Sequence, residues 1–180
     1  MYMDAIIAGF GGQGVMLIGN LLAYAGMHHG LEVTYIPVYG PEMRGGTANC
    51  TVVLSDEPIG SPIIHTPQSL IIMNGPSLTK FAPRLVDGGV LVLNTSLVPE
   101  ETADASRVRV IGVPANEIAD GIGNTRMANM VALGAYVAAT EVMPLDVVEA
   151  SLSSVISSHY SHLIPKNVEA LRAGAACVKR

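Results

Sequence analysis

The glycine-rich segment GFGGQG, Gly9–Gly14, is the feature that most constrains the fold of this chain. It follows the apolar run Ala5–Ile7 and precedes a stretch with apolar residues at helical spacing, namely Met16, Leu17, Leu21, Leu22 and Ala25. The pattern predicts a buried strand, a tight turn and a helix over Gln13–His29, ended by Gly30. Glycines at such a junction let backbone N–H groups approach a phosphate, but they also occur where a helix packs closely on its strand.

The rest of the chain predicts an α/β fold. Five further short apolar runs are bounded by Gly, Asn or Pro, as is typical of buried strands: LEVTYIPV, TANCTVVLSD, SLIIMN, GVLVLN and VRVIGV. The last third is helical, with almost no polar face over residues 124–143 and two amphipathic helices following Pro144 and Pro165. We expect residues 1–180 to form a single Rossmann-like three-layer domain, with a mostly parallel sheet, helices on both faces and a helical C-terminal third.

Composition restricts the partners of this chain. Charged residues make up 14% of the sequence, against a usual share of about 25%. This shortage of charge indicates a subunit that buries part of its surface, although a compact domain with a large core explains it equally well. The net charge is −5 and the Lys and Arg residues form no run, so nucleic acid is not expected as a partner.

Membrane and metal chemistry are also not expected. The longest strongly apolar stretch, MVALGAYVAA, is about half of the roughly 20 residues that span a bilayer. No basic segment precedes Arg44, so no signal peptide is indicated and we expect a cytoplasmic protein. The two cysteines, Cys50 and Cys177, are too few for a zinc site or a four-cysteine iron–sulfur cluster.

The glycine segment can be tested against the requirements of dinucleotide binding. Gly9, Gly11 and Gly14 have the G-x-G-x-x-G spacing, but that site also needs an acidic side chain at the carboxyl end of the second strand. Glu32 lies at the entry end of that strand instead, and no Lys-Ser or Lys-Thr pair follows the glycines as a P-loop requires. Both observations argue against a free-standing dinucleotide-binding Rossmann oxidoreductase, which we keep as an alternative. A purely structural protein whose glycines serve packing is a second alternative.

A second loop, PVYGPEMRGGTANC, leaves the second predicted strand at the edge where the first loop opens, so we expect the two loops to face each other. Arg44, followed by Gly45 and Gly46, can present its guanidinium to a phosphate or a carboxylate. An internal contact between Glu42 and Arg44 that stiffens the loop is the alternative.

Together, GFGGQG and YGPEMRGGTAN resemble the gamma subunit or domain of the 2-oxoacid:ferredoxin oxidoreductases. The resemblance covers essentially the whole chain, including SDEPIGSPII and the apolar NMVALGA segment, and it is closer to the pyruvate, 2-oxoglutarate and branched-chain members than to the indolepyruvate members. It implies a subunit of an enzyme that oxidatively decarboxylates a 2-oxoacid to an acyl-CoA. The catalytic groups would lie elsewhere, with thiamine diphosphate, magnesium and iron–sulfur clusters on alpha, beta and delta partner subunits and ferredoxin contacted only indirectly.

The resemblance implies no catalytic residue and no stably bound cofactor for this chain alone. We therefore expect the two loops to line the entrance of a shared active site and to dock on the alpha and beta subunits. The helix N-terminus at Gly12–Gly14 and the guanidinium of Arg44 suggest the phosphates of coenzyme A as their small-molecule contact. The candidate site residues are Gly11, Gly12, Gln13, Gly14, Tyr39, Gly40, Glu42, Arg44, Gly45, Gly46 and Thr47. Tyr39 is expected to serve packing or an interface. The isolated chain is expected to form a homodimer that covers its apolar surface.

Overall fold

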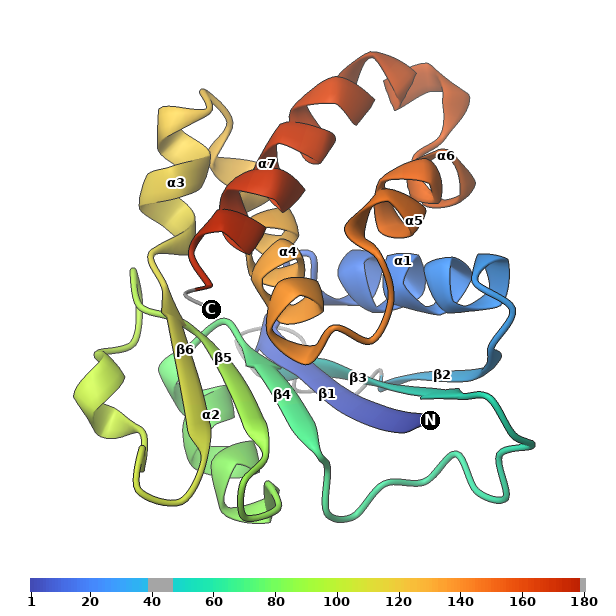
Figure 1. Ribbon diagram of the computed structural model, residues 1–180. Helices are drawn as coiled ribbons and strands as arrows, with labels where there is room; N and C mark the ends of the chain where they lie inside the picture. The colour runs from blue at the N-terminus through green and yellow to red at the C-terminus, as the bar shows by residue number, and fades with distance from the viewer. Residues whose placement is uncertain (39–46, 179–180) are drawn as a thin grey trace.

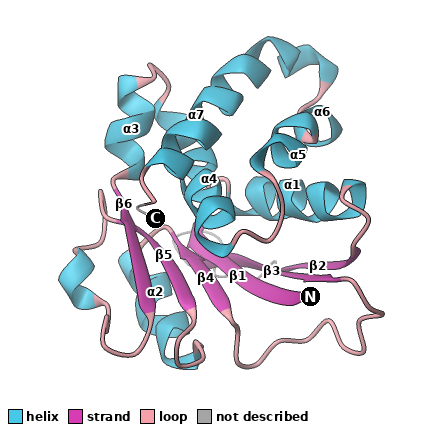
Figure 2. Ribbon diagram, in the orientation of Figure 1, coloured by secondary structure: helices cyan, strands magenta, loops and turns pink. Residues whose placement is uncertain are grey.

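The computed structural model describes residues 1–38 and 47–178. The strands are β1 (Tyr2–Phe10), β2 (Glu32–Val38), β3 (Thr47–Ser55), β4 (Ser69–Ile72), β5 (Val90–Asn94) and β6 (Arg109–Val113). The α-helices are α1 (Val15–His28), α2 (Gly75–Phe81), α3 (Ala115–Gly121), α4 (Ala128–Thr140), α5 (Leu145–Ala150), α6 (Leu152–Val155) and α7 (Ile164–Ala176). Short 3-10 helices are η2 (Ala82–Arg84), η3 (Glu100–Thr102), η4 (Thr125–Met127) and η5 (Ser158–Leu163). Figures 1 and 2 show their arrangement.

The described strands form one mixed sheet in the order β2-β3-β1-β4-β5-β6. Strands β1, β4, β5 and β6 are parallel, as the sequence predicts, but β3 is antiparallel to both of its neighbours. The connection between β2 and β3, residues 39–46, explains the difference. It has eight residues, whereas a crossover between parallel strands takes about a dozen or more, so β3 turns back beside β2.

The register of β3 fixes where the two loops attach. Phe10, the last residue of β1, pairs with Thr47, and Val38, the last residue of β2, lies opposite Asn49. Both ends of the connection 39–46 therefore lie at the edge of the sheet where the GFGGQG segment leaves β1. The prediction that the two loops open at one edge is confirmed for their attachment points.

Helices cover both faces of the sheet (Figure 1). The larger core lies between one face and the helices α1, α4 and α7, and the smaller core lies between the other face and α2. Helix α4 has eleven buried residues among its thirteen, which confirms the prediction of a helix without a polar face. Gly134 of α4 and Gly174 of α7 each face backbone atoms of the other helix, so the two helices cross at close range.

Three predicted helices differ from the structure at their ends. The first begins at Val15 rather than Gln13, because Gly12 and Gly14 have positive φ values of 91° and 73°. The helix predicted over 124–143 is shorter, with η4 before it and Glu141 as its C-cap. The segment after Pro144 divides into α5 and α6 at Ser151, whose hydroxyl donates to the carbonyl of Val147 at 2.8 Å. Within the described residues, none of the helices combines the length and the apolar character that crossing a membrane requires.

Candidate functional site

The GFGGQG segment forms a tight turn that leads directly into α1. The backbone N–H of Gln13 donates to the carbonyl of Phe10 at 3.1 Å, and Gly14 takes the N-cap position in the left-handed region. Among the side chains that the structure describes, none caps this helix. The N–H groups of a first helical turn have no partner within the helix and carry its positive dipole end, so this turn is suited to an anion.

Different physical demands explain the individual glycines. A Cβ on Gly9 would lie 2.9 Å from Cβ of Met73, and a Cβ on Gly14 would collide with the side-chain amide of Asn129. Close packing therefore accounts for Gly9, and close packing together with a φ of 73° accounts for Gly14. Gly12 differs, since no atom of the described residues lies within 4 Å of a Cβ placed there, and its φ of 91° favours glycine. Packing against the described residues therefore does not explain why position 12 is a glycine.

Gln13 ties the turn to the neighbouring strand. Its Oε1 accepts from the backbone N–H of Phe10 at 2.6 Å, and its Nε2 donates to the carbonyl of Met73 at 3.2 Å. Met73 directly follows β4, and its own N–H donates to the carbonyl of Ala8 at 2.8 Å. Both ends of the Gln13 amide are thus engaged within the protein, and the residue holds the turn in place.

The second loop lies largely outside the described residues. Tyr39, Gly40, Glu42, Arg44, Gly45 and Gly46 belong to that segment. Thr47 opens β3, but its side chain is also outside the described part. The flanking residues Val38 and Asn49 lie at the edge that carries the glycine turn.

Glu32, the only acid that the dinucleotide spacing offers, lies at the opposite end of the strands from the glycine turn. It pairs with Ser55 at the far end of β3, whereas Phe10 and the glycine turn lie beside Thr47. The carboxylate of Glu32 therefore cannot hold a ribose bound at the glycine turn.

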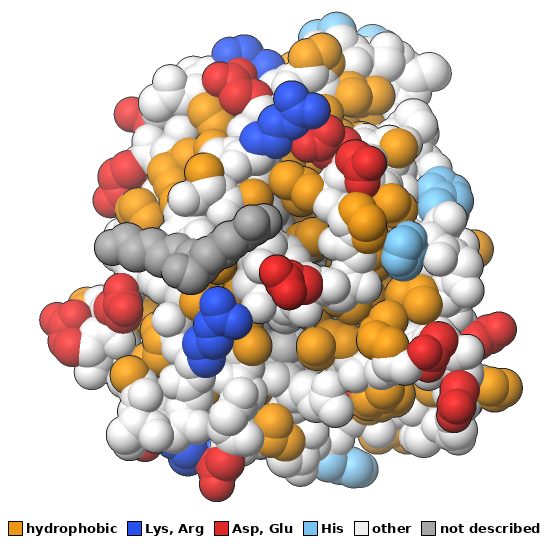
Figure 3. Space-filling view, in the orientation of Figure 1, with side chains coloured by type: hydrophobic (Ala, Val, Ile, Leu, Met, Phe, Trp, Pro, Cys, Tyr) orange, Lys and Arg blue, Asp and Glu red, His pale blue; other side chains and the backbone are white. Residues whose placement is uncertain are grey.

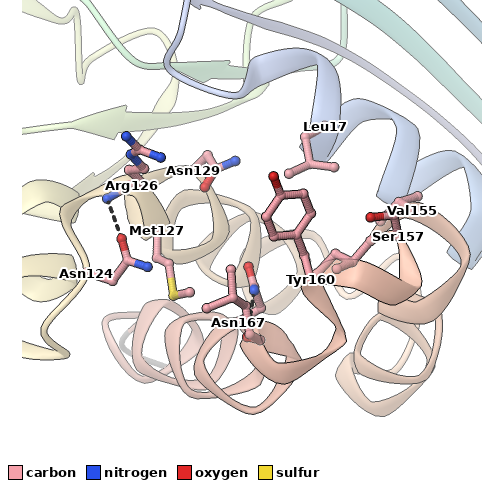
Figure 4. Close-up of a pocket in the computed structure, with 11 residues that line it drawn as sticks. Leu17, Asn124, Arg126, Met127, Asn129, Val155, Ser157, Tyr160 and Asn167 are labelled. Atoms are coloured by element: carbon pink, nitrogen blue, oxygen red, sulfur yellow. Dashed lines mark hydrogen bonds between the residues drawn. The ribbon is translucent and has the colours of Figure 1, made fainter.

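A cavity of about 390 Å³ lies beside the first turn of α1, where the sequence analysis did not predict one. Its walls come from α1, from the residues around η4, from the turn after α6 and from α7 (Figure 4). The polar lining residues are Asn124, Arg126, Asn129, Ser157, Tyr160 and Asn167. In Figure 4 the ring of Tyr160 spans the cavity with its hydroxyl toward Leu17 and Asn129, and Arg126 lies at the far side.

Asn129 connects this cavity to the glycine turn. Its side chain is buried, its Nδ2 donates to the carbonyl of Gly14 at 3.2 Å, and its Oδ1 accepts from the backbone N–H of Met130 at 2.8 Å. The exposed guanidinium of Arg126 stands one helical turn before it. A cation, amide and hydroxyl groups and apolar walls therefore lie next to an uncapped helix N-terminus, which suits an anion joined to a flat organic group.

The polar residues of NTRMAN directly before the apolar helix were the available sequence signal for this site. Their importance could not be recognised because Gly14 and Asn129 are 115 residues apart in the chain.

The thiol closest to the glycine turn is not suited to nucleophilic chemistry. Cys50 lies beneath α1 with its Sγ 3.5 Å from the carbonyl oxygen of Val15, and burial raises the pKa of this thiol to about 12. It therefore stays protonated at neutral pH. Among the residues that the structure describes, no group of three His, Cys, Asp or Glu side chains is placed to hold a metal ion.

The fold and the turn together define a Rossmann-like domain whose glycine segment opens a helix without the acid of a dinucleotide site. The chain belongs to the pyruvate ferredoxin/flavodoxin oxidoreductase family, whose model matches residues 4–177. This match confirms the family expected from the sequence, and the alternative of a free-standing dinucleotide-binding oxidoreductase is not favoured.

Two relatives illustrate the relationship. The chain is 41% identical over 172 residues to ketoisovalerate oxidoreductase subunit VorA of Methanothermobacter thermautotrophicus, which covers 94% of this chain and 35% of the relative. It is 34% identical over 180 residues to 2-oxoglutarate synthase subunit KorC of Methanothermobacter marburgensis, covering 97% of this chain and 95% of that protein. The chain thus spans about a third of the length of the ketoisovalerate relative and nearly the whole length of the 2-oxoglutarate relative.

Solved structures share the fold. The gamma subunit of a keto/oxoacid ferredoxin oxidoreductase from Geobacter sulfurreducens superposes with a TM-score of 0.84 at 26% identity, over 98% of this chain and 95% of that one. The 2-oxoglutarate:ferredoxin oxidoreductase from Magnetococcus marinus, with 2-oxoglutarate, coenzyme A and succinyl-CoA bound, gives a TM-score of 0.85 at 24% identity. That match covers 98% of this chain and 31% of the longer one, and it shows the fold alone.

Proposed function

We propose that this chain is the gamma subunit of a thiamine-dependent 2-oxoacid:ferredoxin oxidoreductase, acting as one gamma-type domain over residues 1–180. The enzyme oxidatively decarboxylates a 2-oxoacid to an acyl-CoA, and this chain shapes the entrance of the shared active site. The observation that carries the proposal is the position of the glycine turn. It opens the uncapped N-terminus of α1 at the edge where both ends of the second loop attach.

The catalytic groups belong to partner subunits in this proposal. Thiamine diphosphate, magnesium and the iron–sulfur clusters lie on alpha, beta and delta subunits of a cytoplasmic complex, and ferredoxin meets those subunits rather than this one. The cysteine chemistry supports this division, because both cysteines are free and Cys50 is buried. The isolated chain forms a homodimer that covers part of the surface otherwise facing its partners.

Coenzyme A is the small molecule that the site suits best. Its phosphates would meet the N–H groups at the start of α1, and its adenosine would enter the cavity beside Tyr160. Arg126 would add a guanidinium from the cavity wall, and Arg44 would add a second one from the loop 39–46. The presence of coenzyme A in the 2-oxoglutarate enzyme of the same fold supports this choice.

The test uses the assembled enzyme with Arg126→Ala and Arg44→Ala. A charge-assisted contact contributes roughly 1.5–3 kcal/mol, so each change should raise the apparent KM for coenzyme A by about tenfold or more and leave the KM for the 2-oxoacid unchanged. Arg172→Ala is the matched control, because this arginine pairs with Glu149 at 2.7 Å on α5. Normal assembly with an unaltered KM for coenzyme A in both variants would contradict the contact. Oxidation of a 2-oxoacid by the isolated chain would contradict the subunit role itself.

A further inference from the structure

A groove of about 500 Å³ lies where three helices of the larger layer end, at the edge of the sheet away from the glycine turn. Its apolar lining comes from the ends of α4 and α7 and from the start of α5: Val137, Val142, Met143, Leu145, Ala175 and Val178. Val137, Val142 and Met143 are buried, whereas the other three are half-buried and remain accessible. The groove is thus open to an apolar side chain from outside.

One acidic side chain, that of Glu141, lies at the rim of this groove. Glu141 ends α4, is exposed and lines the groove together with the exposed His29 at the end of α1. The carboxyl end of α4 also carries the negative end of the helix dipole. The guanidinium of Arg109, on β6, donates to one carbonyl of this helix end, that of Ala139, at 3.0 Å. Apolar walls with an acid at the rim complement an apolar segment that carries a Lys or Arg.

The start of β1 and the end of α7 lie on the face that carries this groove. Strand β1 starts at this edge of the sheet, and Ala175 and Val178 at the end of α7 line the groove itself. Figure 1 shows the start of β1 and the end of α7 on the viewer's side, with the end of α4 between them. Figure 3 shows hydrophobic side chains gathered across the centre of the same view.

The longer relatives indicate what occupies this face. In the ketoisovalerate relative the matched region is 35% of the chain, so the remaining polypeptide must join the domain at one or both of its ends. The 2-oxoglutarate enzyme of the same fold extends likewise, since the match covers 31% of its chain. A segment tethered after α7 starts beside the groove, because Ala175 and Val178 line it, and its effective concentration there is high.

We propose that the groove docks the neighbouring polypeptide of the complex, namely the part that is covalently continuous with this domain in the longer relatives. The docked segment is apolar and carries one basic side chain that pairs with Glu141. The inference rests on the proposed subunit role, but it places the contact at the opposite end of α1 from the glycine turn. The coenzyme A site and the docking groove are therefore separate surfaces.

The test measures binding of the chain to its co-expressed partner subunits by pull-down and by titration at two salt concentrations. Glu141→Lys should weaken binding by about tenfold, since it replaces attraction by repulsion. Glu141→Gln should weaken it less and reduce its dependence on salt. Ala138→Phe, which fills the groove, should also weaken binding. The controls are Glu169→Lys and Ala150→Phe, which change exposed residues outside the groove.

The outcomes separate this inference from the proposed function. In one outcome the native protein assembles normally while both Glu141 variants keep the wild-type affinity and salt dependence. That result would overturn the docking role of the groove and leave the subunit role intact. Failure of the native chain to assemble with any partner subunit would instead contradict the subunit role. Loss of a homodimer in the Glu141 variants, with partner binding unchanged, would show that a second copy occupies the groove and would also overturn the inference.

Discussion

Alanine substitutions at Gly12 and Gly14 should separate the two reasons for glycine in the turn. Both positions have positive φ, which costs an L-residue roughly 1–2 kcal/mol. A Cβ at position 12 meets no atom of residues 1–38 and 47–178 within 4 Å, whereas a Cβ at position 14 collides with the amide of Asn129. Overpacking of this kind adds roughly 1–3 kcal/mol. We expect a loss of about 1–2 kcal/mol for Gly12→Ala and about 2–5 kcal/mol for Gly14→Ala.

Urea unfolding of the isolated chain, followed by circular dichroism, measures these losses. Each kcal/mol should also lower Tm by about 2–4 °C in a protein of this size. The double variant Gly14→Ala with Asn129→Ala isolates the collision, because it removes the amide that the new methyl group meets. Asn129→Ala alone loses a hydrogen bond to the Gly14 carbonyl, at a cost of about 1–2 kcal/mol.

The two losses should therefore not be additive. The double variant should be less destabilised than the sum of the single variants by about 1–2 kcal/mol, as expected for residues in direct contact. Additive losses, or a larger loss for Gly12→Ala than for Gly14→Ala, would refute the packing explanation of Gly14. The same variants in the assembled enzyme would show whether the open position at Gly12 is needed for coenzyme A.

Three further predictions concern the core. Burial raises the pKa of Asp4, which accepts from the N–H of Gln68 at 2.7 Å, so the folded chain holds the proton of this carboxyl more tightly than the unfolded chain does. Ionised Asp4 thus costs stability above its folded pKa, and Asp4→Asn should be more stable than the native protein at pH 7, with a difference in urea midpoint that shrinks toward pH 4. Gly134→Ala would push a Cβ into the backbone of Leu171 and should cost about 2 kcal/mol or more in urea unfolding, whereas Ala138→Gly, at a half-buried position of the same helix, should cost about 1 kcal/mol. In the native protein Cys50 should not react with a disulfide reagent at pH 8, because its thiol is buried with a pKa of about 12, and rapid modification of both cysteines would contradict that burial.

The order of strands and helices followed from local patterns, because burial of a strand or a helix face leaves a periodic trace in the sequence. The runs that became β4, β5 and β6 show this, as does α4, whose missing polar face indicated a buried helix. The glycine turn was equally predictable, since a strand followed by closely spaced glycines and a helical pattern restricts the backbone at that point. The family was indicated by the resemblance of the two loop sequences, and the match over residues 4–177 confirms it.

Only the tertiary structure decided which elements became neighbours. Periodicity gives the buried face of a strand but not its partner, so the antiparallel insertion of β3 between β2 and β1 came from the structure, although the short connection 39–46 favoured it. The engagement of Gln13 with Met73 and the cavity that joins Leu17 to Asn129 and Tyr160 likewise depend on residues far apart in the chain. Sequence therefore determined the elements and the backbone of the turn, and long-range packing determined what surrounds it.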